Sequence, residues 1–204
     1  MKIVYLFDIV CPWCYIGKKY FDNIDISLKN KIANITWQPY FLNPNLTLKG
    51  INRKDYLSSK FGGENNANYI YKNIYIAGKK ANIEFNFDAI KIMPNSLNIM
   101  YLITLIKNHN TASLLIDELF KAFFEKGENI GDIKILSKYA VKYLESFNLS
   151  IFDNNKNKNY LLIIDQEFKN KGISAVPGII VDEKYFISGA VKTQKLNLLL
   201  KKSY

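Results

Sequence analysis

The chain has 204 residues, and its 28 basic and 18 acidic residues give a formal net charge of +10. Hydrophobic residues make up 49% and charged residues 23%, an ordinary globular balance. Among the basic residues only Arg53 is an arginine, the residue that nucleic-acid readers favour, so we predict no nucleic-acid partner. No apolar run approaches the roughly 20 residues that cross a bilayer, and no secretory signal is recognisable, so we expect no membrane partner and a cytoplasmic location.

The first part of the chain predicts a strand, a helix and a second strand. The mostly apolar segment KIVYLF (2–7) is typical of a buried strand. Apolar residues recur at helical spacing over 15–30, and Pro12 suits the first turn of that helix, where an N–H is not needed. The segment NITWQPYFL (34–42) predicts a strand in which Pro39 indicates a sheet edge or a strand end.

A long segment with a helical pattern, about 43–157, follows the second strand. His109 is expected in a polar loop between two of its helices. The Gly-Gly pair at 62–63 and the asparagine-rich tract at 154–159 predict surface loops. Apolar periodicity predicts helices over 96–107, 113–127 and 132–144.

The last part of the chain predicts a helix, a β-hairpin and a final helix. The first helix covers 158–172 and ends at a glycine. The segments GIIVD (178–182) and KYFISG (184–189) are almost adjacent and read as a hairpin. A closing helix is expected over 193–202. Strands therefore stand at both ends of the chain with helices between them, which indicates an α/β fold.

The only two cysteines, Cys11 and Cys14, stand in the segment FDIVCPWCYIG. Their disulfide would close so short a loop that it would stabilise the fold little, which favours a chemical role for the pair. At the start of a helix the dipole favours negative charge, so we expect Cys11 to be the nucleophilic thiolate and Cys14 the resolving thiol. Pro12 and Trp13 add no charge and are expected to tune the redox potential.

Three other roles are compatible with these residue types. A zinc site needs about four ligands, and beyond the two cysteines only His109 and carboxylates remain, so no metal is predicted. Two inert buried thiols are a second alternative. Asp8, three residues before Cys11, could transfer a proton to or from the cysteine pair, or it could form an Asx turn at the end of the strand.

Three segments together resemble the DsbA-like thioredoxin superfamily, in particular its FrnE-like branch. FDIVCPWCYIGKKYF is similar to the active-site segment of that family. LFKAFFEKGENIGDIKILSKYA (119–140) resembles its helical insertion, and GISAVPGIIVDEKYFISGAVK (172–192) resembles its hairpin with a proline-containing loop ahead. The resemblance implies a thioredoxin fold with a large helical insertion domain.

The resemblance also implies a division of the chain and a substrate site. A discontinuous thioredoxin-like domain would comprise 1–42 and 158–204, and the helical insertion domain 43–157. The Val176–Pro177 bond is expected to be cis and to face the cysteines. The backbone of Val176 would then pair with a bound substrate chain.

The function implied is that of a DsbA/FrnE-like thiol–disulfide oxidoreductase that oxidises or isomerises protein or small-molecule thiols. It needs no cofactor besides the Cys11–Cys14 pair, although glutathione stays open as a co-substrate. One alternative is a glutathione-dependent isomerase or transferase of the 2-hydroxychromene-2-carboxylate isomerase or kappa type, which usually has serine first and no second cysteine. A second alternative is a non-catalytic peptide-binding module. The oligomeric state is not predicted.

Overall fold

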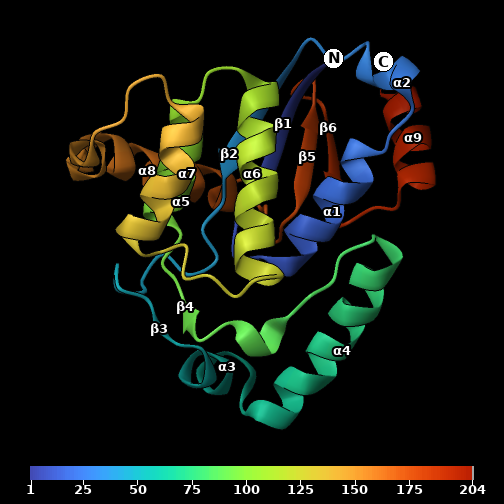
Figure 1. Cartoon of the computed structure of the whole chain (residues 1–204). Coiled ribbons are helices and arrows are strands. Elements are labelled where there is room, and N and C mark those ends of the chain that lie inside the picture. Colours follow the sequence, from blue (N-terminus) through green and yellow to red (C-terminus); the bar gives the residue numbers. More distant parts are fainter. Residues whose placement is uncertain (204) are drawn as a thin grey trace.

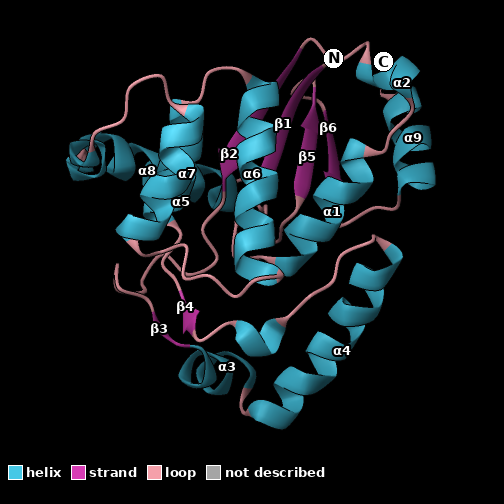
Figure 2. Cartoon of the chain, in the orientation of Figure 1, coloured by secondary structure: helices cyan, strands magenta, loops and turns pink. Residues whose placement is uncertain are grey.

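The computed structural model describes residues 1–203, except for the side chains at 64 and 65. Its centre is a four-stranded sheet in the order β2-β1-β5-β6 (Figures 1 and 2). β1 pairs in parallel with β2 and antiparallel with β5, and β5 pairs antiparallel with β6. The bounds of the strands are Lys2–Phe7 (β1), Asn34–Pro39 (β2), Gly178–Val181 (β5) and Tyr185–Ser188 (β6).

The sheet joins the two ends of the chain, because β1 and β2 come from the first forty residues and β5 and β6 from the last thirty. Leu6 of β1 stands opposite Gly178 of β5, so the register brings the end of β1 to the start of β5. Pro39 ends the edge strand β2, as its sequence predicted. The predicted hairpin is likewise confirmed as β5 and β6.

Helices surround the sheet, and a second group lies beyond the end at which α1 begins (Figure 1). That second group is formed by α3, α4 and the short antiparallel pair β3–β4. Within residues 1–203, no helix is both long enough and apolar enough to cross a bilayer. The remaining elements are α1 (Pro12–Asp22), α2 (Ile26–Lys29), β3 (Ile51–Asn52), α3 (Arg53–Phe61), α4 (Glu64–Lys80), β4 (Ile92–Met93), α5 (Leu97–Leu105), α6 (His109–Phe124), α7 (Ile133–Tyr143), α8 (Asn155–Asn170) and α9 (Thr193–Lys202).

Three local expectations were wrong. The helix predicted over 15–30 is divided in two, since α1 ends at Asp22 and α2 starts after Asp25. His109 is the first residue of α6 rather than part of a loop, because the Asn108 side chain caps the helix by accepting from two backbone N–H groups. The tract 154–159 begins α8 instead of forming a loop, because the Asn154 side chain caps that helix by accepting from the N–H of Asn157.

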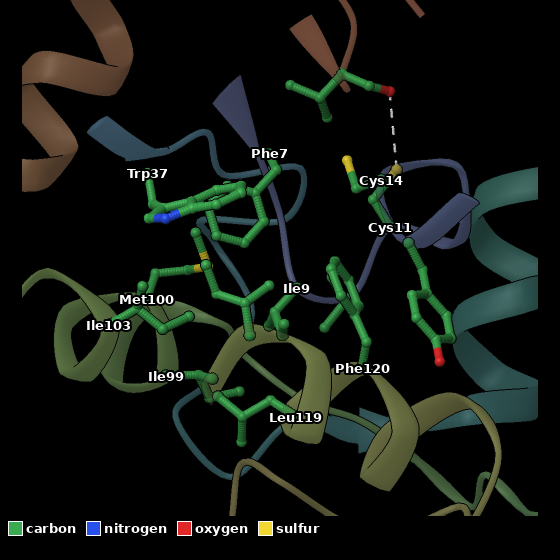
Figure 3. Packing of buried hydrophobic residues seen from close by; sticks show 14 of the residues in the cluster. Phe7, Ile9, Cys11, Cys14, Trp37, Ile99, Met100, Ile103, Leu119 and Phe120 are labelled. Atoms are coloured by element: carbon green, nitrogen blue, oxygen red, sulfur yellow. Dashed lines mark hydrogen bonds between the residues drawn. The ribbon is translucent and has the colours of Figure 1, made fainter. Parts of the chain in front are cut away.

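The hydrophobic core is continuous from the sheet into the helices. Phe120 of α6 stacks on Tyr15 of α1 with ring centroids 4.9 Å apart, and it also contacts Phe7 at the end of β1. Figure 3 shows side chains of α5 and α6 closing around the segment that leads from β1 to the cysteines. The residues labelled there on these helices are Ile99, Met100, Ile103, Leu119 and Phe120.

Candidate active site

The two cysteines lie where the chain leaves β1 and enters α1. Cys11 is the N-cap residue, with extended backbone, and Pro12 is the first residue of the helix. Cys14 follows within the first turn, and its N–H donates to the carbonyl of Cys11 (3.0 Å). Cys11 is 5% exposed, Cys14 is fully buried, and Trp13 between them is 38% exposed. The motif therefore presents Trp13 to solvent and offers a small part of Cys11, while Cys14 is enclosed.

The loop before β5 reaches the first cysteine. The Val176–Pro177 peptide bond is cis, in the conformation expected from the sequence. The Cys11 thiol donates to the Val176 carbonyl across 3.8 Å, and the dashed line in Figure 3 marks this contact. Val176 precedes the β1–β5 ladder, which starts at Gly178. The sequence positions 11 and 176 are thus brought together at one end of the sheet.

Gly17 permits the close packing of α1 on this loop. A Cβ at this position would lie 2.7 Å from Cγ of Pro177 and 3.0 Å from the Tyr5 hydroxyl. The first distance is too short for a packed interior, and the second would require the hydroxyl to move slightly. Sequence reasoning missed this residue, although a glycine within a predicted helix is a signal of close approach.

Asp8 is fully buried below the cysteine motif. Its Oδ1 accepts from the N–H of Val10 (3.2 Å), and its Oδ2 accepts from the N–H of Leu42 (2.9 Å). Burial raises the pKa of Asp8 to about 6, although these hydrogen bonds and one with Ser96 favour the charged form. The Asx turn expected as an alternative is therefore present, and the same carboxyl titrates near neutrality.

Cys14 and Tyr5 form the floor of the site. Burial raises the pKa of the Cys14 thiol well above its usual range, and hydrogen bonding to Cys11 and the Asp8 charge raise it further. Burial also raises the pKa of the Tyr5 phenol, with the Cys14 charge as the next cause. The floor of the site thus holds Cys14 in its neutral thiol form and places Asp8 within electrostatic reach of it.

The part of the chain described, residues 1–203, contains no cluster of three or more histidine, cysteine, aspartate or glutamate side chains arranged to hold a metal ion. His109 lies at the start of α6, where its carbonyl accepts from Nε1 of Trp37 (2.9 Å). The residues brought together are therefore Asp8, Cys11, Cys14, Val176 and Pro177.

Comparison with known families decides the classification. The model of the DSBA-like thioredoxin domain matches residues 2–201. The chain belongs to this family. As a DSBA-like thioredoxin domain it has the thioredoxin-like DsbA fold predicted from the sequence. The family consists generally of disulfide oxidoreductases.

Protein YwbO of Bacillus subtilis (strain 168) is 28% identical to this DSBA-like chain over 136 residues, which are 65% of the chain and 61% of YwbO. The match thus spans less than two thirds of that relative's length.

Solved structures share the fold at low sequence identity. A probable DsbA oxidoreductase from Streptomyces coelicolor is 18% identical, with a TM-score of 0.81 over 100% of this chain and 89% of its own. The cytosolic disulfide reductase DsbM from Pseudomonas aeruginosa, solved with GSH, is 10% identical, with a TM-score of 0.70 over 99% and 98%. A 2-hydroxychromene-2-carboxylate isomerase is 13% identical, with a TM-score of 0.67 over 99% and 94%. The fold alone therefore does not separate the oxidoreductase from the isomerase.

Proposed function

We propose that this DSBA-like protein is a thiol–disulfide oxidoreductase in which Cys11 exchanges with the substrate and Cys14 resolves. The observation that carries the proposal is the placement of the Cys11 thiol at the start of α1 and against the Val176 carbonyl, ahead of the cis Pro177. The start of a helix favours negative charge, as an attacking or leaving thiolate requires. Cys14 is close enough to close the disulfide and too buried to meet a substrate first.

The oxidation of a substrate dithiol takes two exchange steps. A substrate thiolate attacks Sγ of Cys11 in the Cys11–Cys14 disulfide, forming a mixed disulfide and expelling the Cys14 thiolate, which takes up a proton. The second substrate thiolate then attacks the substrate sulfur of the mixed disulfide, which forms the substrate disulfide and expels the Cys11 thiolate. The substrate loses two electrons and the protein gains them. Isomerisation starts instead from the reduced pair. The Cys11 thiolate attacks a substrate disulfide, forming a mixed disulfide and expelling one substrate thiolate. Another substrate thiolate then attacks the substrate sulfur of the mixed disulfide, which forms a new substrate disulfide and releases the Cys11 thiolate.

Asp8 is the proposed proton donor and acceptor for Cys14. The leaving Cys14 thiolate is unfavourable in its buried position, since burial raises the pKa of that thiol. A carboxyl whose pKa is about 6 can deliver a proton as the thiolate forms and can take one back when Cys14 attacks. The buried position of Asp8 next to the cysteine loop therefore supports this role.

Val176 is the proposed docking point for the substrate backbone. It lies directly before the start of β5 and already accepts from Cys11, so an extended peptide could form main-chain hydrogen bonds with it next to the reacting sulfur. The exposed Trp13 would provide an apolar contact next to the same sulfur.

The second thiol distinguishes this proposal from the isomerase or transferase alternative. Those enzymes usually have serine first and no second cysteine, whereas this chain places Cys14 directly behind Cys11. A peptide-binding module needs no redox pair. Glutathione is a proposed co-substrate, since DsbM, whose fold is similar, was solved with GSH. The cytoplasmic location stays a prediction that cell fractionation would test.

Trapping tests the assignment of the two cysteines. In Cys14→Ser the mixed disulfide has no resolving thiol, so a peptide disulfide should accumulate on Cys11 and be visible as one added mass by intact-protein mass spectrometry. Cys11→Ser should trap little, because Cys14 is fully buried. The Cys11→Ser/Cys14→Ser variant is the control for non-specific adducts. Equal trapping in both single variants would contradict the assignment. A wild-type protein that never cycles between dithiol and disulfide in a glutathione titration would contradict the function.

A further inference from the structure

Residues of α3, α4 and the segment before β4 line a cavity of about 600 Å³. These elements lie beyond the end of the sheet at which α1 begins (Figure 1). This volume is within the range of small-molecule sites. Aromatic side chains form much of its wall, and Arg53 is the only arginine of the chain. The aromatic lining residues are Tyr71, Tyr75, Phe85 and Phe87.

Arg53 is held by its surroundings but lacks an acidic partner. Its backbone N–H donates to the carbonyl of Lys91 (2.9 Å), which fixes the start of α3. The guanidinium lies over the rings of Tyr71 (5.0 Å) and Phe87 (5.7 Å). Among the side chains that the structure describes, which exclude those at 64 and 65, no carboxylate forms an ion pair with it, and its buried Nε has no hydrogen-bond partner. A buried donor without a partner is costly, and a bound carboxylate would satisfy it through the planar fork of the guanidinium.

The charges around the cavity favour a ligand with one negative charge. Arg53 and Lys72 contribute two positive charges, and Asp88 contributes one negative charge. A single carboxylate would bring the net charge of the cavity to zero, whereas a doubly charged phosphate would leave it negative. The aromatic walls suit a ring attached to that carboxylate.

The cavity lies within electrostatic reach of the active site. Burial raises the pKa of the Tyr71 phenol, the Arg53 charge lowers it, and the Cys11 charge raises it. The pKa of Tyr56, on α3, is raised mainly by burial and responds to the same two charges. Phe85 of the cavity wall also contacts Tyr15, the residue after Cys14 in α1, with ring centroids 6.1 Å apart, so the cavity adjoins the first turn of α1.

We propose that this cavity binds the aromatic carboxylate portion of a small disulfide, with Arg53 holding the carboxylate while the disulfide reaches Cys11. The inference rests on the proposed function and names the substrate class of the same site. The Cys11 thiolate attacks one sulfur of the disulfide and expels one aryl thiolate. Cys14 loses its proton and attacks Sγ of Cys11, which expels the second aryl thiolate. The disulfide gains two electrons and the protein becomes the Cys11–Cys14 disulfide.

Two aromatic disulfides distinguish recognition of the carboxylate from recognition of the ring. Dithiobis(nitrobenzoate) carries carboxylates, and dithiodipyridine is neutral; both release a coloured thiolate that stopped-flow absorbance follows. We expect Arg53→Gln to lower the ratio of the two rate constants (nitrobenzoate over pyridine) by about tenfold, since it removes a charge-assisted bidentate contact. Arg53→Lys, which keeps the charge and loses the fork, should lower the ratio less.

Lys54→Gln is the matched control, because Lys54 is exposed, adjacent in sequence, outside the cavity lining and of the same charge. It should leave the ratio within about twofold, as expected for a screened surface charge. An unchanged ratio in Arg53→Gln, or an equal fall in Lys54→Gln, would overturn the inference. Failure of the proposed function has a different signature, namely that the wild-type protein consumes neither disulfide through the Cys11–Cys14 pair.

A second measurement needs no variant and so does not depend on the folding of Arg53→Gln. Benzoate carries the ring and the carboxylate without a disulfide, and benzamide is its neutral counterpart. Benzoate should slow the reaction of the wild-type protein with dithiodipyridine by occupying the cavity, and benzamide should not. Equal effects of the two compounds, or no effect of benzoate, would contradict the proposed site.

Discussion

Asp8 places a carboxyl group in a position with no solvent exposure, where two backbone N–H groups stabilise its charged form. These bonds do not offset the loss of hydration, so burial raises the pKa of Asp8 from 3.8 to about 6. A carboxyl whose pKa is higher in the folded state than in the unfolded state binds more protons when folded. Its contribution to stability is therefore greatest at low pH and is lost as the pH rises from about 4 to about 6.

This linkage predicts the pH dependence of Asp8→Asn. The shift of roughly two pKa units corresponds to about 3 kcal/mol, so the free energy of unfolding of the variant should gain about that much relative to the wild type between pH 4 and pH 7. Urea denaturation of both proteins across this range measures the difference. Any hydrogen bond lost with the carboxylate gives an offset that is already present at pH 4 and does not change the slope. A difference that is constant with pH would show that Asp8 titrates as in the unfolded chain.

The sequence could single out the cysteine pair, Asp8 and Pro177 as candidates because each stands in a short motif whose chemistry is local. It could not show that Asp8 is fully buried, since that burial depends on Leu42 and on the start of α5. The relation of Arg53 to the site was equally out of reach, because it depends on rings from α4 and from the segment before β4. A residue's chemistry can be read from sequence, but its distant neighbours cannot.

At the scale of single elements, α1 meets the Pro177 loop through Gly17. Gly17→Ala would place a methyl group 2.7 Å from a rigid proline ring. We expect it to destabilise the fold by about 1–3 kcal/mol, as overpacking does, and to slow trapping at Cys11 because the loop must move. Thermal unfolding and the trapping assay measure the two effects.

A double-mutant cycle identifies the clash. In Pro177→Ala the ring is absent, so Gly17→Ala should cost less stability in that background than in the wild type. The new methyl group would still lie 3.0 Å from the Tyr5 hydroxyl, so the loss of stability should become smaller without disappearing. Equal penalties in both backgrounds would show that the loop does not limit the packing of α1.

A buried lysine connects α1 to α6. Lys18 is 1% exposed, and its Nζ donates to Asp22 (2.8 Å) and to Asp117 of α6 (2.9 Å). The same ammonium lies 5.3 Å from the ring centre of Trp37 in β2. The charge is thus fully compensated although the side chain is inside the protein.

Lys18→Met should leave Asp22 without its cation and Asp117 with only the longer contact to Lys19. Breaking a buried ion pair costs about 3–5 kcal/mol, and we expect the lower end because Asp22 and Asp117 remain 32% and 25% exposed. Chemical denaturation at neutral pH measures the loss. Lys19→Met, which affects a longer contact to Asp117 (3.6 Å), is the matched control and should cost well under half as much. Similar losses in both variants would show that burial of the Lys18 charge is not the cause.

The elements themselves could largely be predicted where periodicity was strong. The strand 2–7, the hairpin and the helices over 97–105 and 133–143 follow directly from apolar spacing. The errors at His109 and at 154–159 have one cause, since polar residues were read as loop where an asparagine caps a helix. The pair β3–β4 was not predicted, because a strand of two residues is too short to show a periodic pattern.

At the scale of the whole molecule, the segment 43–157 shares its core with the rest of the chain. Phe120 of α6 stacks on Tyr15 and contacts Phe7. Phe85, which lies between α4 and β4, also contacts Tyr15. Several side chains of α6 are fully buried, so an isolated segment would expose a large apolar face. The division of the chain into a thioredoxin-like part and a helical part is therefore proposed as a topological description, not as two folding units.

A polypeptide comprising 43–157 alone should show no cooperative unfolding transition. It would retain helical propensity but lose the partners of Phe120 together with the Lys18–Asp117 ion pair and the bond from Trp37 to the His109 carbonyl. Both tryptophans lie outside this segment, so circular dichroism and tyrosine fluorescence in urea are the suitable probes, with the whole chain as the control. We expect a broad, shallow transition with a small m-value, because little surface remains to be exposed. A sharp transition, coincident by both probes, would show that the helical segment folds independently and that the core continuous with α1 and β1 is not required for it.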